Sequence, residues 1–530
     1  MKQELEKIVR SALAELYSSA VESVIGIPGQ KYGDFSTNAA LLLASQRNEP
    51  LPEIAKKIAE HIKLNDRNNL FKSVDSTRTG FVNFILSDTF LQENLLRIKR
   101  EGSNYGRTKK YDGKKVLMEF VSANPTGPLH IGHGRWAVIG DDIASLLEAV
   151  GYKVDREFYV NDCGNQVEKL EASVIARANG QEIPEGGYGG AYVVDLADKL
   201  RSDIGKPSFR NILLNTMLDD QKRVLGGLDV KFDRFFSEKS LHEEGKVKES
   251  IEKMKKSGTT FIEQGALWFK STDYGDDKNR VIVRENGEST YFAADIAYHL
   301  DKLNRGYDLL INVWGADHHG YVARLKTALK ALGHPLEKLE VIIGQLVSLY
   351  RGAEPVRMSK RTGDMITLEE VVEEIGKDAT RFFLTMVTAQ SHLDFDLDLA
   401  KKHATENPVY YVQYAHARLM SIFREWEAKG PKTDEAPDLS LLAHPSERIL
   451  MRKLLDYEDE IAAAAGKRAP HLLVEYAKNL AAIFHNYYHK CRVISEDEKM
   501  SRARLRLCET TRIVIRNVLE LLKVDAPERM

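Results

Sequence analysis

The chain has 530 residues, of which 43% are hydrophobic and 29% are charged, so it can bury large cores and is long enough for about three domains. Its formal net charge of -2 does not by itself indicate a polyanionic partner, and any such contact must come from local clusters of positive charge. Cys163, Cys491 and Cys508 form no C-x-x-C pair, which argues against a disulfide framework or a cysteine-built zinc site.

Nothing in the sequence predicts contact with a membrane. No apolar run reaches the roughly 20 residues of a membrane span, and the charged start of the chain lacks the apolar core of a signal peptide. We therefore expect a cytoplasmic protein with no protein-built metal site.

The first 110 residues predict a separate α+β domain. Apolar residues at helical spacing predict helices over 2–24, 36–45 and 52–63, and TGFVNFIL (79–86) alternates like a strand. The basic segment 97–115 is interpreted as a linker to the next domain.

Residues 111–395 predict an α/β domain, and residues 396–530 a helical one. In the former, apolar strands alternate with amphipathic helices, which is typical of a parallel sheet covered by helices on both faces. The predicted strands are 116–121, 156–160, 281–284, 309–317 and 340–350, with a mixed insertion at about 165–280. From about Leu397 onward we find only segments with helical periodicity.

The most informative segment follows the strand 116–121. Residues 123–135 read A-N-P-T-G-P-L-H-I-G-H-G-R. Ligands of a parallel sheet bind at the carboxyl ends of its strands, and a helix that starts there offers free N–H groups to phosphates. His130 and His133 are three residues apart, so both can face one ligand from the first helical turn. A pair of structural or metal-binding histidines is the alternative.

Two further segments lie where the same ligand would be contacted. Arg357–Gly363 (R-M-S-K-R-T-G) follows the last predicted strand, and Lys360 on such a loop can neutralise phosphate charge; a basic surface turn is the alternative. Val313–Gly320 (V-W-G-A-D-H-H-G) ends another strand, with a zinc site as the alternative.

Together these segments resemble the signatures of class I aminoacyl-tRNA synthetases. R-M-S-K-R is similar to the family's K-M-S-K-S loop, with arginine in place of the first lysine and the last serine. The resemblance implies a Rossmann-type catalytic domain in which His130, His133 and Lys360 are catalytic and stabilise phosphate charge. It implies ATP as a substrate, accompanied by Mg²⁺ without a protein cage, and ATP contacts from Pro125, Gly127, His130, Gly132, His133, Gly315, Asp317, Met358 and Lys360.

The amino acid must be inferred from side-chain chemistry. An arginine guanidinium is planar, always charged and has five donors, so its pocket needs carboxylate acceptors. Tyr291 and Asp295 open a predicted helix on one face, while Glu119 and Asn124 flank the end of the first strand. Chemistry alone leaves lysine open, and an isolated aspartate often only caps or salt-bridges a helix.

These positions resemble those of arginyl-tRNA synthetases. The resemblance implies that Asp295 pairs with the guanidinium, that Tyr291 bonds the substrate and that Asn124 holds its α-amino or carboxylate end. Glu119 would support the site, and His318 would also contact arginine.

The outer domains resemble the same family. Tyr32–Asn38 and Gly80–Phe84 are similar to its N-terminal add-on domain, which meets the tRNA D-loop. There Asn83 can read a base edge, and Phe81 or Phe84 can stack on a base, unless the phenylalanines are core. Segments 408–418 and 484–493 look like its anticodon-binding bundle, where Tyr410, Tyr414 and Arg492 are our candidates for tRNA contact.

The sequence therefore predicts ligation of L-arginine to tRNA(Arg) through arginyl-adenylate, with release of AMP and pyrophosphate, by a monomer. Members of the family commonly need bound tRNA before they activate arginine. The alternatives are a lysine or cysteine synthetase, a small-molecule nucleotidyltransferase, and a non-catalytic RNA-binding protein derived from a synthetase. Missing cysteine ligands argue against the cysteine enzyme, and the intact His130, His133 and Lys360 argue against a non-catalytic protein.

Overall fold

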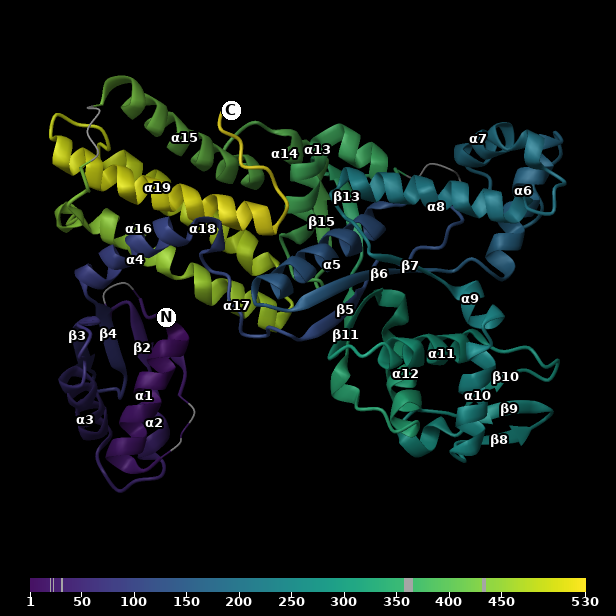
Figure 1. Cartoon of the computed structure of the whole chain (residues 1–530), viewed down its shortest axis with the longest axis horizontal. Coiled ribbons are helices and arrows are strands. Elements are labelled where there is room, and N and C mark those ends of the chain that lie inside the picture. The colour runs from purple at the N-terminus through teal and green to yellow at the C-terminus, as the bar shows by residue number, and fades with distance from the viewer. Residues whose placement is uncertain (20, 22, 30–31, 357–365, 431–434) are drawn as a thin grey trace.

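The structure is a computed structural model (Figure 1) that describes residues 1–19, 21, 23–29, 32–356, 366–430 and 435–530, apart from the side chains of Asp317 and Lys429. The purple N-terminal unit and the yellow-green C-terminal helices lie toward one end, and the parallel sheet lies toward the middle. Within the described residues, no helix is both long and apolar enough to cross a bilayer.

The N-terminal unit is an α+β domain, as predicted. Its sheet is antiparallel in the order β1-β2-β4-β3. The elements are α1 (Lys2–Tyr17), β1 (Ile25–Gly26), β2 (Phe35–Thr37), α2 (Ala39–Ala44), α3 (Leu51–Leu64), β3 (Phe71–Ser76), β4 (Val82–Leu86) and α4 (Asp88–Glu101). The predicted helix 36–45 starts only at Ala39, because Phe35–Thr37 pair with β4. The predicted linker 97–115 is wrong at its start, where residues up to Glu101 complete α4.

A five-stranded parallel sheet forms the centre of the molecule in the order β12-β11-β5-β6-β7. These strands are β5 (Lys115–Glu119), β6 (Lys153–Val160), β7 (Arg234–Ser237), β11 (Leu309–Gly315) and β12 (Leu339–Gly344). The chain adds strands outward from β5 on one side and then returns to β11 on the other. The carboxyl ends of β5 and β11 therefore form the switch point at which such sheets bind ligands.

Helices cover both faces of this sheet, as predicted. On one face, α5 (Ile131–Ala149) packs so closely that a Cβ on Gly140 would lie 2.3 Å from the ring of Phe120. On the other, α11 (Tyr291–Asn304) reaches Glu119 through Lys302. Since Glu119 and Phe120 are neighbours, their side chains point to opposite faces. The next helix, α12 (His319–Ala331), follows β11.

Two predicted strands need correction. The segment 281–284 does not join the parallel sheet: β10 (Arg280–Val283) pairs with β9 (Ala266–Phe269), which pairs with β8 (Thr260–Glu263), all antiparallel. The segment 340–350 is two strands, β12 and β13 (Val347–Arg351), and β13 pairs with β14 (Glu354–Pro355) and β15 (Leu393–Asp396). The two strands are separated at Gln345 and Leu346, whose carbonyl oxygens accept hydrogen bonds from the buried Arg135 guanidinium over 3.0 and 3.2 Å.

The remaining helices form the insertion and the C-terminal part. The insertion contains α6 (Asn165–Ala178), α7 (Ala191–Lys199), α8 (Phe209–Gly227), α9 (Glu238–Glu243) and α10 (Lys246–Lys256). The helix α13 (Leu368–Thr385) lies before the predicted boundary, within the α/β domain. From Leu397 onward the helices are α14 (Leu397–Lys401), α15 (Pro408–Lys429), α16 (Pro445–Leu455), α17 (Tyr457–Lys467), α18 (His471–Lys490) and α19 (Glu498–Leu521), which confirms the helical prediction. The domain boundaries at 110/111 and 395/396 stay predictions.

Candidate functional site

The two histidines of the H-x-x-H motif start α5 and cap one another. The N–H of His133 donates to Nδ1 of His130, and the N–H of His130 donates to Nδ1 of His133, each over 3.3 Å. Their rings stack with centroids 3.7 Å apart. Because each Nδ1 accepts a backbone N–H, a neutral ring carries its proton on Nε2, which makes both histidines donors to an anion. Gly132 fits closely under this pair, since a Cβ there would lie 2.9 Å from the His130 ring.

The start of α13 is joined to this motif. Thr367 forms a β-bridge with His130, and the N–H of Leu368 donates to the Leu129 carbonyl over 2.8 Å. A Cβ on Gly134 would meet the Leu368 side chain at 2.4 Å. The helix that follows the predicted K-M-S-K-S-like loop therefore begins against the histidine motif.

The turn before the histidines is held by the insertion, a contact that the sequence did not predict. Gln221 on α8 donates to the carbonyls of Asn124 and Gly127 at 3.0 and 3.1 Å, and the Tyr192 hydroxyl on α7 donates to the Thr126 carbonyl at 2.9 Å. Pro125 and Gly127 thus lie in a fixed turn at the carboxyl end of β5. The Asn124 side chain donates to Gln166 over 2.6 Å.

Two acidic side chains that lie close enough for their charges to interact, Asp295 and Glu238, form what we call the carboxylate pocket. Asp295 on α11 accepts a hydrogen bond from the Tyr321 hydroxyl on α12. Burial raises the pKa of Asp295 to about 7, with further increases from the charges of Glu238 and Glu119. Glu238 on α9 is 3% exposed. Its pKa is also raised by burial, although Tyr159 and Cys163 donate hydrogen bonds to it. No described cation forms an ion pair with Asp295 or Glu238, so the pocket offers two uncompensated acceptors.

Sequence reasoning missed Glu238 and Tyr321. Glu238 lies in S-E-K-S-L-H-E, which resembles no motif, far from Asp295 in the chain. Tyr321 follows the segment W-G-A-D-H-H-G directly, and that position was the available signal.

Glu119, by contrast, already has a cation. It stands opposite Asn312 on β11 and Glu157 on β6, so three polar residues form one row across the sheet. Lys302 from α11 forms an ion pair with Glu119 and donates to Asn312 over 3.0 Å. Ser122 donates to the other oxygen of Glu119 over 3.0 Å. These contacts suit a supporting residue better than a direct ligand of a guanidinium.

The other predicted residues lie around the same end of the sheet. Tyr291 is the first residue of α11, with 58% of its surface exposed. Gly315 ends β11, and the exposed His318 ring lies 5.7 Å from that of Trp314. Met358 and Lys360 lie outside the described residues, as does the side chain of Asp317.

The predicted tRNA contacts lie on the outer domains. Asn83 is half-buried on β4, Phe81 is 39% exposed, and Phe84 is fully buried and packs on Phe71 at 5.3 Å between ring centroids. Phe84 is therefore a core residue, which leaves Phe81 as the stacking candidate.

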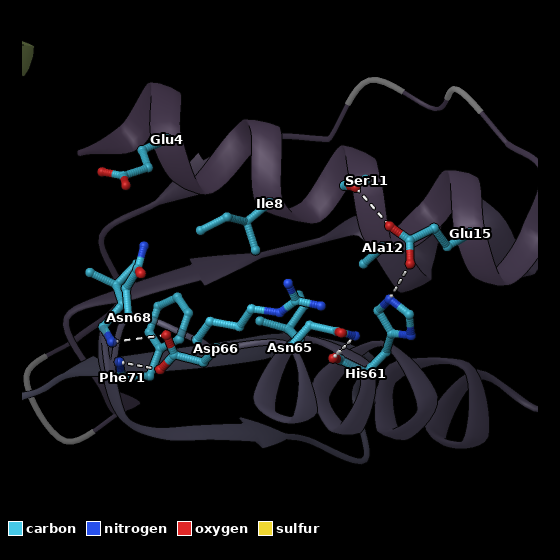
Figure 2. Close-up of a pocket in the computed structure, with 13 residues that line it drawn as sticks. Glu4, Ile8, Ser11, Ala12, Glu15, His61, Asn65, Asp66, Asn68 and Phe71 are labelled. Carbon is cyan, nitrogen blue, oxygen red and sulfur yellow. Dashed lines mark hydrogen bonds and ion pairs between the residues drawn. The ribbon is translucent and has the colours of Figure 1, made fainter.

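The N-terminal domain has a cavity of about 380 Å³ lined by residues of α1, of α3 and of the segment that follows α3; Figure 2 shows the lining residues. Several of its polar groups bond to one another or to the nearby backbone. Glu15 pairs with His61 over 3.1 Å and accepts from Ser11 over 2.9 Å, while Asp66 accepts the N–H groups of Leu70 and Phe71. We assign it no role.

On the C-terminal helices, aromatic rings and a cation form a ladder. Tyr410 and Tyr414 stack with ring centroids 6.0 Å apart. The Arg418 guanidinium lies 4.6 Å from the centroid of the Tyr414 ring and donates to its hydroxyl over 2.6 Å. The same guanidinium lies 5.1 Å from the centroid of Tyr488 on α18. Arg492 is exposed just beyond α18. Such a surface can stack unpaired bases and bind phosphates.

Comparison with known families matches all three parts of the chain. Residues 3–86 match the arginyl tRNA synthetase N terminal domain, residues 94–185 and 188–393 the catalytic domain of class I (R) tRNA synthetases, and residues 412–530 the DALR anticodon binding domain. The arginine–tRNA ligase of Desulforudis audaxviator is 48% identical over 96% of this chain and 93% of its own length. The chain belongs to the arginyl-tRNA synthetase family.

Other members of the arginyl-tRNA synthetase family agree with this placement. The arginine–tRNA ligase of Heliobacterium modesticaldum is 45% identical over 95% of this chain and 93% of its own length. The arginyl-tRNA synthetase of Thermus thermophilus superimposes over the full length of both chains with a TM-score of 0.79 at 25% identity. The sequence prediction of the family and of its class I fold is therefore confirmed, and a synthetase for lysine or cysteine is not favoured.

Proposed function

We propose that this chain joins L-arginine to tRNA(Arg) with consumption of ATP, through an arginyl-adenylate intermediate. The observation that carries the proposal is the pair of carboxylates without a cation, Asp295 on α11 and Glu238 just after β7, in a fold that also places the histidine motif after β5. A guanidinium is the ligand that supplies a matching fork of donors and a permanent positive charge.

Arginine binds between α9, α11 and the end of β5. Asp295 and Glu238 take the guanidinium, and Tyr321 holds Asp295 in place through its hydroxyl. Tyr291 and His318 stand at the exposed side of the pocket, and there they contact the rest of the substrate. Asn124 binds the α-amino or carboxylate end of arginine. Glu119, already paired with Lys302, supports the pocket without binding the substrate directly.

ATP binds at the start of α5. The Nε2–H donors of His130 and His133, together with the helix N-terminus, bind phosphate oxygens and stabilise charge as it builds up. Pro125, Gly127 and Gly132 shape the backbone there, and Gly315 and Asp317 contact the ribose. Met358 and Lys360 are assigned on their sequence motif alone.

Two displacements complete the reaction. A carboxylate oxygen of arginine attacks the α-phosphorus of ATP, and pyrophosphate leaves with the bonding electrons. A terminal ribose hydroxyl of the tRNA then attacks the carbonyl of the adenylate, and AMP leaves as the ester forms. Mg²⁺ enters as part of the MgATP substrate, bound to phosphate oxygens. No described carboxylate cage lies at the histidine motif, so no protein-built magnesium site is proposed.

The tRNA is held by both outer domains. Asn83 and Phe81 contact it from the N-terminal sheet, and Tyr410, Tyr414 and Arg492 contact it from the C-terminal helices. We further propose that the protein acts in the cytoplasm as a monomer.

The test is charging of total tRNA by the purified chain with ATP and each amino acid in turn. We expect charging with arginine alone. His133→Ala should lower kcat by about 10²-fold or more, as for loss of one transition-state donor, and Asp295→Ala should abolish saturation by arginine while both variants stay folded by circular dichroism. Charging with a different amino acid would contradict the pocket assignment. Binding of tRNA without any charging would favour a non-catalytic RNA-binding protein.

A further inference from the structure

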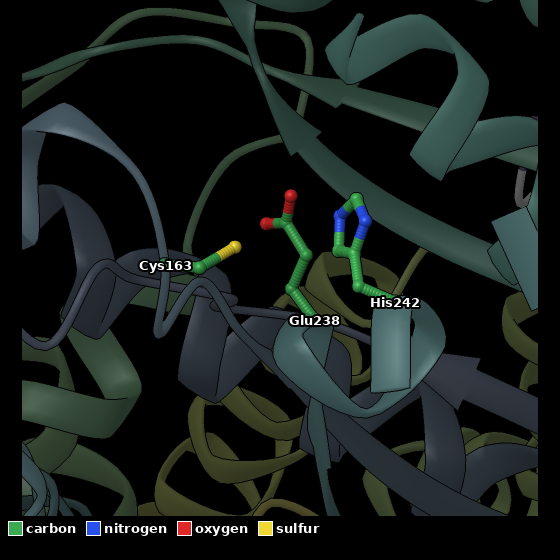
Figure 3. A group of neighbouring side chains, drawn as sticks. All are labelled: Cys163, Glu238 and His242. Carbon is green, nitrogen blue, oxygen red and sulfur yellow. The ribbon is translucent and has the colours of Figure 1, made fainter. Parts of the chain in front are cut away.

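Three side chains that no motif connects meet beside the carboxylate pocket. In Figure 3 the Cys163 sulfur points toward the Glu238 carboxylate, and the His242 side chain extends from the same helix beside Glu238. One potential ligand atom from each, a sulfur, a carboxylate oxygen and a ring nitrogen, lies within 4.8 Å of the other two. In the part of the chain that the structure describes, no other three histidine, cysteine or acidic side chains converge in this way.

The fold brings these residues together from two neighbouring strands. Cys163 follows the end of β6, while Glu238 begins α9 directly after β7, and β6 and β7 are parallel neighbours. Their carboxyl ends therefore adjoin. Glu238 and His242 are four residues apart on α9, so both project from one face of the helix.

Burial gives the cluster a closed side and an open side. Glu238 is 3% exposed and Cys163 is half-buried, while His242 is exposed. Glu238 is thus shielded from solvent, Cys163 partly so, and His242 is accessible to it. No described cation pairs with Glu238, so a divalent cation would meet a carboxylate that lacks a counter-charge.

We propose that Cys163, Glu238 and His242 bind a zinc ion, with a fourth position left to water. A thiolate, an imidazole and a carboxylate are the ligand types of zinc, and three protein ligands with one open position are typical of its accessible sites. The thiol gives up its proton to solvent when the metal binds, and no redox step is involved.

The geometry requires only a small adjustment. In a tetrahedral site with zinc bonds of ordinary length, ligand atoms lie roughly 3.3 to 3.8 Å apart. The three ligand atoms lie within 4.8 Å of one another, so any pair near that limit would have to move closer by about 1 Å or more when zinc binds. The sequence predicted no metal site because Cys163 is far from the other two ligands in the chain and no two cysteines are close together.

Zinc and arginine compete for Glu238. This consequence rests on the proposed function, in which Glu238 binds the guanidinium. A carboxylate held by zinc no longer offers its charge to arginine, and the metal adds positive charge near Asp295. Bound zinc therefore raises the KM for arginine.

The binding test uses the full chain, freed of metal with a chelator and titrated with Cd²⁺ and Zn²⁺. Cd²⁺ bound to a thiolate gives an ultraviolet charge-transfer band, and Zn²⁺ affinity follows from its displacement of Cd²⁺. The other two cysteines, Cys491 and Cys508, are buried, so the band should report Cys163. We expect one equivalent of metal, no band in Cys163→Ser, and at least about tenfold weaker Zn²⁺ binding in Cys163→Ser and His242→Ala.

His61→Ala is the matched control, because His61 also stands beside a glutamate, Glu15, at 3.1 Å. We expect it to bind Zn²⁺ as the unaltered chain does. Equal Zn²⁺ affinity in the unaltered chain, Cys163→Ser and His242→Ala would overturn the site, even in a protein that charges tRNA normally.

Adding arginine distinguishes failure of the zinc site from failure of the proposed role of Glu238 in arginine binding. We expect added arginine to weaken Zn²⁺ binding, and Zn²⁺ to raise the KM for arginine in the unaltered chain but not in Cys163→Ser. If Cys163→Ser and His242→Ala lose Zn²⁺ while arginine has no effect on it, the metal site stands and the assignment of Glu238 to the arginine pocket fails.

Discussion

The affinity for arginine should fall steeply below neutral pH, because Asp295 must be ionised to pair with a guanidinium. Without arginine the pKa of Asp295 is raised to about 7, mainly by burial. A bound guanidinium favours the ionised form and lowers that pKa, so binding at low pH must first remove a proton. Arginine's own guanidinium stays charged throughout. The affinity for arginine is thus nearly full at about pH 8 and above, and it is lost as the pH falls through about 7.

The magnitude follows from the ionised fraction. With a pKa of about 7, roughly a tenth of Asp295 is ionised at pH 6 and roughly nine tenths at pH 8. The Kd for arginine should therefore rise about tenfold from pH 8 to pH 6, equivalent to about 1.4 kcal/mol. Calorimetric titration with arginine at several pH values measures this change. Repeating it in two buffers of different ionisation enthalpy counts the protons released.

Two variants shift the midpoint in opposite directions. The Tyr321 hydroxyl lowers the pKa of Asp295, so Tyr321→Phe should move the midpoint to higher pH. The charge of Glu238 raises that pKa, so Glu238→Gln should move the midpoint to lower pH, although it also weakens binding. If the pH dependence came from a nearby histidine rather than from Asp295, the midpoint of the affinity change would be the same in Tyr321→Phe and Glu238→Gln as in the unaltered chain. Constant affinity from pH 6 to 8, or shifts of equal sign, would refute the reasoning.

Three further predictions concern packing and tRNA. Lys302→Met leaves the buried Glu119 without its cation, so it should lower the free energy of unfolding, measured in urea, by about 3–5 kcal/mol. The double variant Lys302→Met/Glu119→Gln should regain part of this stability, and a double variant as unstable as Lys302→Met would contradict the pairing. Tyr414→Ala removes one ring from the ladder. It should raise the KM for tRNA about tenfold with kcat little changed, because one stacked base contributes about 1–3 kcal/mol. An unchanged KM for tRNA in charging assays would argue against contact between Tyr414 and the tRNA. Gly140→Ala places a Cβ 2.3 Å from the Phe120 ring and should destabilise the fold by about 1–3 kcal/mol in thermal unfolding, whereas a stabilised variant would show that helix propensity outweighs the clash.

The sequence predicted most where chemistry and local structure share one short segment. His130 and His133 start a helix directly after a strand, so the motif, its position and its capping follow from adjacent residues. The parallel sheet was predictable for the same reason, since apolar strands and amphipathic helices alternate along the chain. The failures were strands whose partner is remote or unexpected. Residues 280–283 look like any buried strand, and only pairing with β9 assigns them to the small antiparallel sheet.

The proposed arginine pocket shows what could not be predicted from the sequence. Asp295 was a candidate because a tyrosine precedes it by one helical turn. Glu238 has no such neighbour, and its importance comes from burial without a cation and from its effect on the pKa of Asp295. Glu119 shows the converse, because its charge looked available in the sequence and is compensated by Lys302 in the fold. Whether a carboxylate can bind a ligand depends on its cations, and these come from distant parts of the chain.

The same dependence on distant partners links the histidine motif to the rest of the molecule. Asp142 on α5 lies in the same helix as His133 and bonds Arg381 on α13, and both side chains are buried. Neighbouring Asp141 also receives Lys523, just beyond α19, over 2.7 Å. The helix that carries His130 and His133 is thus connected at its middle to α13 and to the segment after α19, while Thr367 pairs with His130 at the start of α13. Because α13 is interrupted at Gly376, between Thr367 and Arg381, these contacts join α5 to two separate helical segments rather than to one straight helix.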